Sequence, residues 1–336
     1  MDAHTEEAVA RKVPPQDSTL AHLPVGLFGS ATGIGGLGAA WRLAHQNLGM
    51  PSWPSEVLAT MSLLVFVVLT IAYLIKAATA PEAVRAEFAH PVSGNLFGLV
   101  PIALMLLPIP LVPLAPRLAT TLWATGAVTC LLFMGVAIFR WMSARQQVEL
   151  ALPAWIIPVA GPLNLPIALP ALGLGNVQEL ATFAFGIGIF FSILVFALIF
   201  SRLIFEAPPP AQALPALLIL TAPFSIGYSA YRIVTGHSDL FAQSLFMIDL
   251  LLVCVLATLL RHLPRCCPFR VSWWAVGFPL AASTVASLHF SAAAPNRINE
   301  GVAMLLLAVT TLVVLWLLLR TTFGILRGEL RQLVSV

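Results

Sequence analysis

The side chains able to do chemistry are few and scattered in this 336-residue chain. The seven histidines form no HExxH or similar zinc-binding pattern, and the four cysteines show no CxxC spacing. Cys130 and Cys254 lie in apolar stretches, whereas Cys266 and Cys267 are adjacent in a basic loop. We interpret that pair as two reduced thiols, with a soft-metalloid site as the alternative. We therefore expect no enzyme activity, no metal and no other cofactor.

One carboxylic acid, Asp249, is unusual because it lies within a long apolar stretch. An ionised carboxylate is costly in hydrocarbon, so an acid at membrane depth suggests a function by default. Two roles remain open for Asp249, namely coupling a proton to transport and a structural hydrogen bond to a neighbouring span. The second is favoured, because the stretch that carries Asp249 is one that we place at the periphery.

The composition is that of a membrane protein. The chain is 59% hydrophobic and 9% charged, with a mean hydropathy of +0.95, whereas soluble domains contain about 25% charged residues. Ten apolar stretches each approach the ~20 residues that a helix needs to cross a bilayer. Strands of a membrane barrel would instead give ~10-residue alternating segments. We predict an all-α polytopic membrane protein with ten transmembrane helices, partnered by lipid and by no nucleic acid.

The ten stretches alternate between two kinds. Five carry prolines and no formal charge, and these run over residues Leu23–Ala40, Pro91–Val112, Pro153–Leu174, Leu214–Tyr231 and Val271–Leu288. The other five carry no proline, and these run over residues Ser55–Ala77, Leu118–Phe139, Val177–Ser201, Leu240–Leu260 and Ile298–Leu319. The alternation indicates a kinked-plus-straight hairpin repeated five times.

Proline within a helix removes a backbone donor and strands a carbonyl group, so broken helices survive at membrane depth only beside protein or water. Kinked odd-numbered helices should therefore lie inside around a pore, and straight even-numbered helices outside against lipid. Five parallel hairpins close most simply into a quasi-fivefold ring. The predicted pore-lining or kink residues are Pro24, Gly29, Pro91, Pro158, Pro223, Gly277 and Pro279. The alternative is that these prolines are ordinary packing kinks.

The predicted pore wall contains hydroxyls and amides but no charged side chain. Its polar members are Ser30, Thr32, Ser93, Asn95, Asn164, Thr221, Ser225, Tyr228, Ser229, Ser272, Ser283 and Thr284. Such a wall binds a permeant ion weakly, which favours conduction. Amides and half-helix N-termini at the kinks would favour anions.

Basic residues predict the orientation. Thirteen of the 17 lysines and arginines lie on the side that holds both termini, and four on the other. The positive-inside rule then places both termini in the cytoplasm. We expect a cytoplasmic tail over residues 1–21, a transmembrane domain over 22–323 and a second cytoplasmic tail over 324–336. The first tail is polar and lacks a cleavage signal, so the first span is expected to remain in the mature chain.

Several segments carry a family resemblance. They are HLPVGLFGSATGIGGLGAAWRLA from His22, EFAHPVSGNLFGLVPIALML from Glu87, WIIPVAGPLNLPIALPALGLG from Trp155, LTAPFSIGYSAY from Leu220, VSWWAVGFPLAASTVASLHF from Val271 and LLLRTTFGILRGEL from Leu317. This series, collinear over nearly the whole chain, resembles the tellurite-resistance and dicarboxylate transporter (TehA-like) family, which includes the plant guard-cell slow anion channels. The resemblance implies ten helices in a quasi-fivefold ring, usually a homotrimer, with a pore in each protomer.

The resemblance also implies a gate. In the family a phenylalanine of the ninth helix plugs the pore, and its position in WWAVGFP corresponds to Phe278. A ring across a narrow, uncharged pore can close it by steric block and dewetting. In the sequence, Gly277 removes bulk beside this ring and Pro279 kinks its helix.

We accordingly expect an anion channel or facilitator of the bacterial inner membrane, passing small anions. The alternative is a proton-coupled carrier of a small carboxylate or oxyanion such as malate or sulfite, and a membrane enzyme or scaffold is a third, weaker possibility. The wall does not distinguish chloride, nitrate, sulfite, tellurite or malate, although dehydration favours large, weakly hydrated anions.

Overall fold

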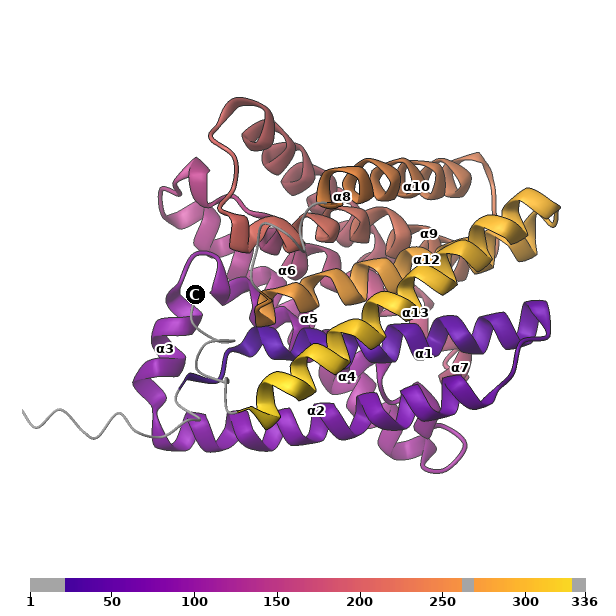
Figure 1. Cartoon of the computed structure of the whole chain (residues 1–336), viewed down its shortest axis with the longest axis horizontal. Coiled ribbons are helices and arrows are strands. Elements are labelled where there is room, and N and C mark those ends of the chain that lie inside the picture. The colour runs from indigo at the N-terminus through magenta and orange to yellow at the C-terminus, as the bar shows by residue number, and fades with distance from the viewer. Residues whose placement is uncertain (1–21, 262–268, 328–336) are drawn as a thin grey trace, which may run out of the picture.

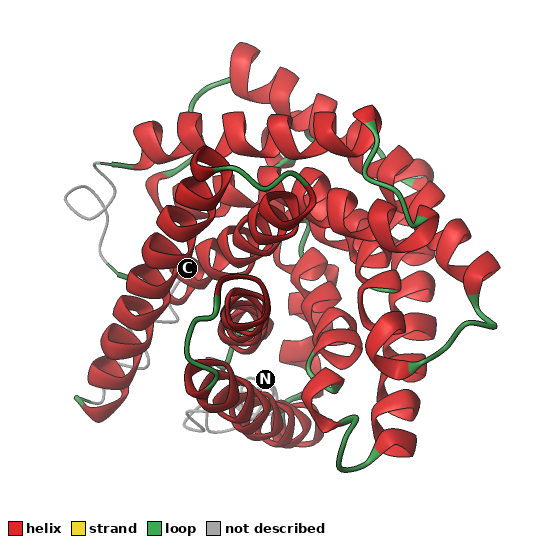
Figure 2. Cartoon of the chain, turned by 90° about the vertical axis from the view of Figure 1, so that its right-hand side faces the viewer, coloured by secondary structure: helices red, strands yellow, loops and turns green. Residues whose placement is uncertain are grey.

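The fold was analysed in a computed structural model that describes residues 22–261 and 269–327. Within these ranges every regular element is a helix, and the long helices lie roughly side by side (Figure 1). Viewed from one end, several helices are seen nearly along their axes (Figure 2). The all-α prediction is confirmed for the described residues.

The proline-free stretches form five long continuous helices. These are α2 (Trp53–Thr79), α5 (Pro116–Ser143), α8 (Gln178–Phe205), α10 (Leu240–Leu260) and α13 (Arg297–Leu326). Within the apolar 18-residue stretch of each helix, only 11–33% of the residues are buried inside the protein. Large exposed side chains such as Leu64, Phe190 and Leu312 show that these helices face outward, as predicted.

The proline-bearing stretches form composite segments, most of which begin with a 3₁₀ turn and continue as α-helix. The five segments are η3 (Val25–Leu27) with α1 (Phe28–Leu48); η4 (Ser93–Gly98) with α4 (Leu99–Leu106) and η5 (Ile109–Leu111); η7 (Pro153–Trp155) with α6 (Ile156–Ala160), η8 (Gly161–Asn164), η9 (Pro166–Ala168) and α7 (Leu169–Leu172); η10 (Ala211–Thr221) with α9 (Ala222–Thr235); and η11 (Val271–Val276) with α12 (Gly277–Ala293). In the last four segments, 56–83% of the residues in the apolar 18-residue stretch are buried. The composite segments therefore form the interior.

Four of these prolines lie where a 3₁₀ turn passes directly into α-helix. Pro101, Pro158, Pro223 and Pro279 lie in the first turns of α4, α6, α9 and α12. Proline donates no backbone N–H, so it removes one hydrogen bond at each of these junctions. The prediction of Pro91 as a kink was wrong, since Pro91 lies in a turn before η4. In this segment, the proline within the first turn of the α-helix is Pro101.

The described residues contain nine helical segments apolar enough to cross a membrane, and the predicted first span is not one of them. That stretch does form a 21-residue helix, α1, but it is rich in glycine and polar residues. Its composition suits a helix surrounded by protein. Side chains from Phe28 to Ile34 are buried without exception.

Short elements complete the fold. α3 (Pro81–Ala89) follows α2 after a one-residue break and lies at one end of the molecule (Figure 1), and η6 (Val148–Leu150) lies in the loop after α5. Asp239 caps α10, where its carboxylate accepts a hydrogen bond from the amide of Ala242. A carboxylate is the favoured cap at this end of a helix dipole.

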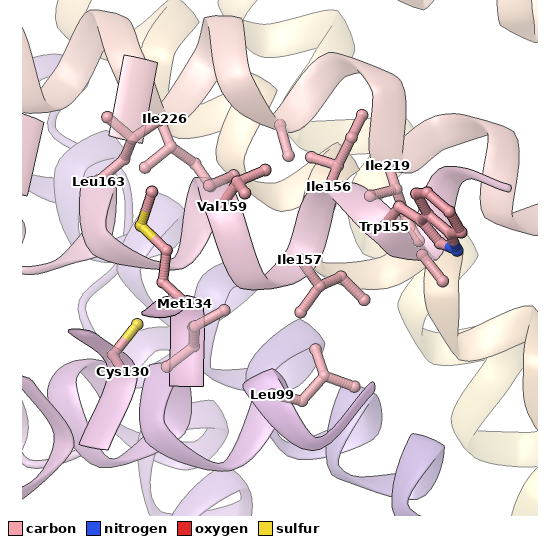
Figure 3. Packing of buried hydrophobic residues seen from close by; sticks show 14 of the residues in the cluster. Leu99, Cys130, Met134, Trp155, Ile156, Ile157, Val159, Leu163, Ile219 and Ile226 are labelled. Carbon is pink, nitrogen blue, oxygen red and sulfur yellow. The ribbon is translucent and has the colours of Figure 1, made fainter. Parts of the chain in front are cut away.

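The main apolar core surrounds α6. Figure 3 shows Ile157 facing Leu99 of α4, while Ile156 and Val159 face Ile219 of η10 and Ile226 of α9. Cys130 of α5 packs here too, as a small apolar side chain. Segments distant in sequence are thus held around a common centre.

Candidate permeation site

A cavity of about 340 Å³ lies at the centre of the composite segments. All five contribute to its wall, and α2, α5, α8, α10 and α13 contribute no residue to it. The interior lining residues include Pro24, Gly26, Gly29, Leu96, Leu99, Ile102, Ile156, Ile157, Ala160, Gly161, Asn164, Ala216, Ile219, Ala222, Ile226, Trp274, Phe278 and Pro279. The predicted inner and outer sets of helices match this division.

The five segments enter the cavity in the same direction. Its mouth is lined by residues at or just before the start of each segment, namely Pro24, Glu87, Leu152, Pro210 and Arg270. The wall ends further along each segment, at Gly29, Ile102, Asn164, Ile226 and Pro279. Beyond those residues the segments pack against one another. The cavity therefore extends from the end bearing α3 to about halfway along the helices, and we call this inner limit its closed end.

Phe278 lies at this closed end. It is the second residue of α12, its side chain is half-buried, and it lines the cavity. Asn164 and Pro279 also line the cavity. Within the described part of the chain, no aromatic stacking holds its ring in place. Phe278 packs against the main apolar core as a partly buried side chain.

A close helix crossing positions the start of α12. A Cβ atom on Gly33 of α1 would lie 3.3 Å from the Cα of Gly277, and one on Gly277 would lie 3.4 Å from the Cα of Gly33. One turn further, a Cβ on Gly36 would lie 2.9 Å from Ala281 and 3.7 Å from the Phe278 ring. The absence of a side chain at Gly277 therefore lets α1 approach α12 closely. The sequence had instead suggested that Gly277 makes room beside the Phe278 ring. The small residues spaced along GSATGIGG could have predicted this contact.

The interior wall is less polar than predicted. Only Ser93, Asn164 and Ser272 of the twelve predicted polar residues line the cavity. Several others satisfy backbone carbonyl groups of their own segments, for example Ser30 with Leu27 and Thr221 with Leu218. Asn164 is the polar side chain at the closed end, and its amide donates to the carbonyl of Gly161 at 3.0 Å.

Charged groups line the mouth rather than the interior. Glu87, His90 and Arg270 belong to the wall, and each lies just outside the predicted charge-free stretches or at their edge. Glu87 is paired with Lys76 of α2, whose Nζ lies 2.7 Å from the Glu87 Oε2. Sequence reasoning missed this pair, because Lys76 had been counted only as a topology signal.

Asp249 does not line the cavity. Its side chain is completely buried on α10, and its Oδ1 accepts a hydrogen bond of 2.8 Å from the hydroxyl of Ser283 on α12. Its Oδ2 has no hydrogen-bond partner in the described part of the chain. The acid therefore links an outer helix to the helix that carries Phe278.

The predicted site residues divide into two groups. Pro24, Gly29, Phe278 and Pro279 line the cavity, whereas Pro91, Pro158, Pro223 and Gly277 do not, because they lie in turns or helix contacts behind the wall. Cys266 and Cys267 lie outside the described residues. Among the described residues, no cluster of histidine, cysteine and carboxylate side chains could hold a metal ion.

Comparison with known proteins identifies the family of this chain. Residues 22–322 match the model of the SLAC1 family, described as voltage-dependent anion channel. The chain belongs to this family. It is a multi-pass membrane protein, and its family comprises anion channels and transporters rather than enzymes. The suspected relationship to TehA-like proteins and guard-cell channels is confirmed.

The relatives fall into plant and microbial groups. The chain is 28% identical over 292 residues to the S-type anion channel SLAH2 of Arabidopsis thaliana, which covers 83% of this chain and 55% of the relative. It is 26% identical over 317 residues to the guard cell S-type anion channel SLAC1 of the same plant, covering 90% and 56%. It thus spans about half the length of these plant proteins. Over 312 residues it is 25% identical to the tellurite resistance protein TehA homolog of Haemophilus influenzae, covering 91% and 92%.

Proposed function

We propose that this protein is a channel or facilitator that passes small anions through the central cavity. The observation that carries the proposal is a single cavity walled by all five composite segments, with its charged groups confined to the mouth. An interior of apolar side chains and one amide offers no tight ionic site, so a permeant anion is bound weakly and can leave. Weakly hydrated anions cross such an interior most easily, because their dehydration costs least.

In this proposal Phe278 is the gate. Its ring lies at the closed end of the cavity, where an aromatic side chain blocks water and ions without any charge. Rotation of one side chain opens the path towards the far ends of α1, α9 and α12. The close contact of Gly33 with Gly277 supports this role, because it fixes the backbone that presents the ring.

The architecture proposed around this pore has ten spans, with α1 as the first, arranged as five hairpins in a quasi-fivefold ring. We further propose that three such protomers associate and that the protein resides in a bacterial inner membrane. Both termini then face the cytoplasm, with tails over residues 1–21 and 324–336 flanking a transport domain over 22–323. The basic side of the chain, and with it the cavity mouth, faces the cytoplasm.

The alternative is a proton-coupled carrier of a carboxylate or oxyanion, including malate, sulfite or tellurite. The position of Asp249 argues against coupling through this acid, because its carboxyl group lies behind the cavity wall and is bonded to Ser283. We assign Asp249 a structural role that ties α10 to α12.

Reversal potentials in proteoliposomes or planar bilayers test the channel proposal. The purified protein should give currents whose reversal follows the anion gradient and does not move when a pH gradient is imposed. Measuring chloride, nitrate, sulfite and malate in turn gives the permeability order. A reversal potential that follows the proton gradient would instead establish the carrier.

A further inference from the structure

The mouth of the cavity contains a buried ion pair. Lys76 near the end of α2 is 3% exposed, and the side chain of its partner Glu87 on α3 is 13% exposed. Charged side chains are almost never this buried unless paired. Glu87 is also the carboxylate in the described cavity wall, whereas Lys76 lies behind it.

Every oxygen of this carboxylate is occupied. Glu87 Oε1 accepts a hydrogen bond of 2.7 Å from the backbone amide of Val25, and Oε2 accepts bonds from Lys76 Nζ at 2.7 Å and from the Tyr73 hydroxyl at 2.9 Å. Lys76 Nζ also donates to the carbonyl oxygen of Leu23 at 2.7 Å. The pair thus fastens the start of the first composite segment to α2 and α3.

The charge of this cluster matters because an anion must pass it. An unpaired carboxylate in the wall would repel anions, and Lys76 cancels that charge at contact distance. Lys76 and Glu87 therefore contribute no net formal charge to the described mouth. Opposite charges in a pore entrance raise the local concentration of a permeant ion, and like charges lower it.

We propose that the Lys76–Glu87 pair sets the charge of the anion entrance, so that Lys76 and Glu87 determine anion access with opposite signs. The inference rests on the proposed anion conduction and adds the residues that control entry. Removing the carboxylate makes the entrance more positive, and removing the ammonium makes it more negative, with an unpaired carboxylate in the wall. Removing both restores the original net charge.

Anion flux of Lys76→Met, Glu87→Gln and the double variant tests this inference in proteoliposomes. At ~0.01 M salt, where the Debye length is about 30 Å, Glu87→Gln should raise chloride flux about twofold and Lys76→Met should lower it about twofold. The double variant should return close to the wild-type flux. At ~1 M salt, where the Debye length is about 3 Å, these differences should vanish.

Three controls separate charge from structure. Tyr73→Phe removes one hydrogen bond to Glu87 without changing charge, so its flux should show no salt-dependent change. Glu82→Gln and Arg85→Gln alter an exposed ion pair on the same helix α3, with side chains 83% and 76% exposed, and should change flux less than the variants of the buried pair do, because neither side chain lines the cavity. If Lys76→Met does not fold, the rise expected for Glu87→Gln alone still tests the proposal.

The inference would be overturned if Lys76→Met and Glu87→Gln lowered the anion flux equally. It would also be overturned if the flux differences between variants persisted at high salt. Either result would show that the pair only stabilises the fold. A wild-type protein that passes no anion would instead refute the proposed function. The two failures are therefore distinguishable.

Discussion

Replacing Gly33 by alanine perturbs the contact that positions Phe278. The added methyl group would lie 3.3 Å from the Cα and carbonyl carbon of Gly277 and 3.4 Å from the amide nitrogen of Phe278. These are backbone atoms, so no side chain can rotate to make room. α1 and α12 must separate by a few tenths of an ångström, and the separation falls at the residue that presents the ring.

The cost can be bounded from two opposing effects. Forcing an extra methyl group into a packed contact costs about 1–3 kcal/mol, whereas alanine gains about 0.5–1 kcal/mol over glycine within a helix. Gly186→Ala on α8 is the matched control, because no atom lies within 4 Å of the position of its added methyl group. Both variants share the helix gain, so their difference of about 1–3 kcal/mol isolates the cost of the contact.

Thermal unfolding of the two purified variants in detergent, followed by near-UV circular dichroism, measures this difference. We expect Gly33→Ala to melt a few degrees below Gly186→Ala and to show altered anion flux, since Phe278 moves with its helix. Equal melting temperatures and wild-type flux in both variants would refute the reasoning that this crossing positions the gate.

Two further predictions concern buried polar groups. Asp249→Ala should destabilise the protein by about 1–3 kcal/mol, because it leaves the buried Ser283 hydroxyl without its acceptor. Asp249→Asn should leave the pH dependence of radiolabelled anion uptake unchanged. Loss of that pH dependence in Asp249→Asn would establish proton coupling. Asn164→Leu should lower anion flux several-fold, because it removes the amide at the closed end of the cavity. Asn95→Leu changes a buried asparagine outside the cavity wall and should not lower the flux. Equal flux in the two variants would exclude a permeation role for Asn164.

The division into inner and outer helices could be predicted from the sequence because proline and hydropathy report local backbone and solvent requirements. The five proline-free stretches did form continuous, largely exposed helices. The role of each proline was less predictable, since Pro101 and Pro223 lie where a 3₁₀ stretch passes directly into α-helix. Whether a proline kinks or starts a helix depends on the neighbouring backbone bonds, which composition does not contain.

The site was predictable only where one segment determines it. The placement of Phe278 and Pro279 in the wall follows from their own segment, together with the family resemblance. The pairing of Lys76 with Glu87 and the crossing of Gly33 with Gly277 join residues from different segments. Such pairings depend on how helices pack, and a single sequence gives no direct signal of them.

The central claim is that the ring of Phe278 closes an anion path through the cavity. Anion current of Phe278→Ala, recorded in oocytes or proteoliposomes beside wild type and the exposed-residue control Phe183→Ala, tests it most directly. The account predicts a current raised many-fold in Phe278→Ala alone. An unchanged current with normal surface expression would contradict it.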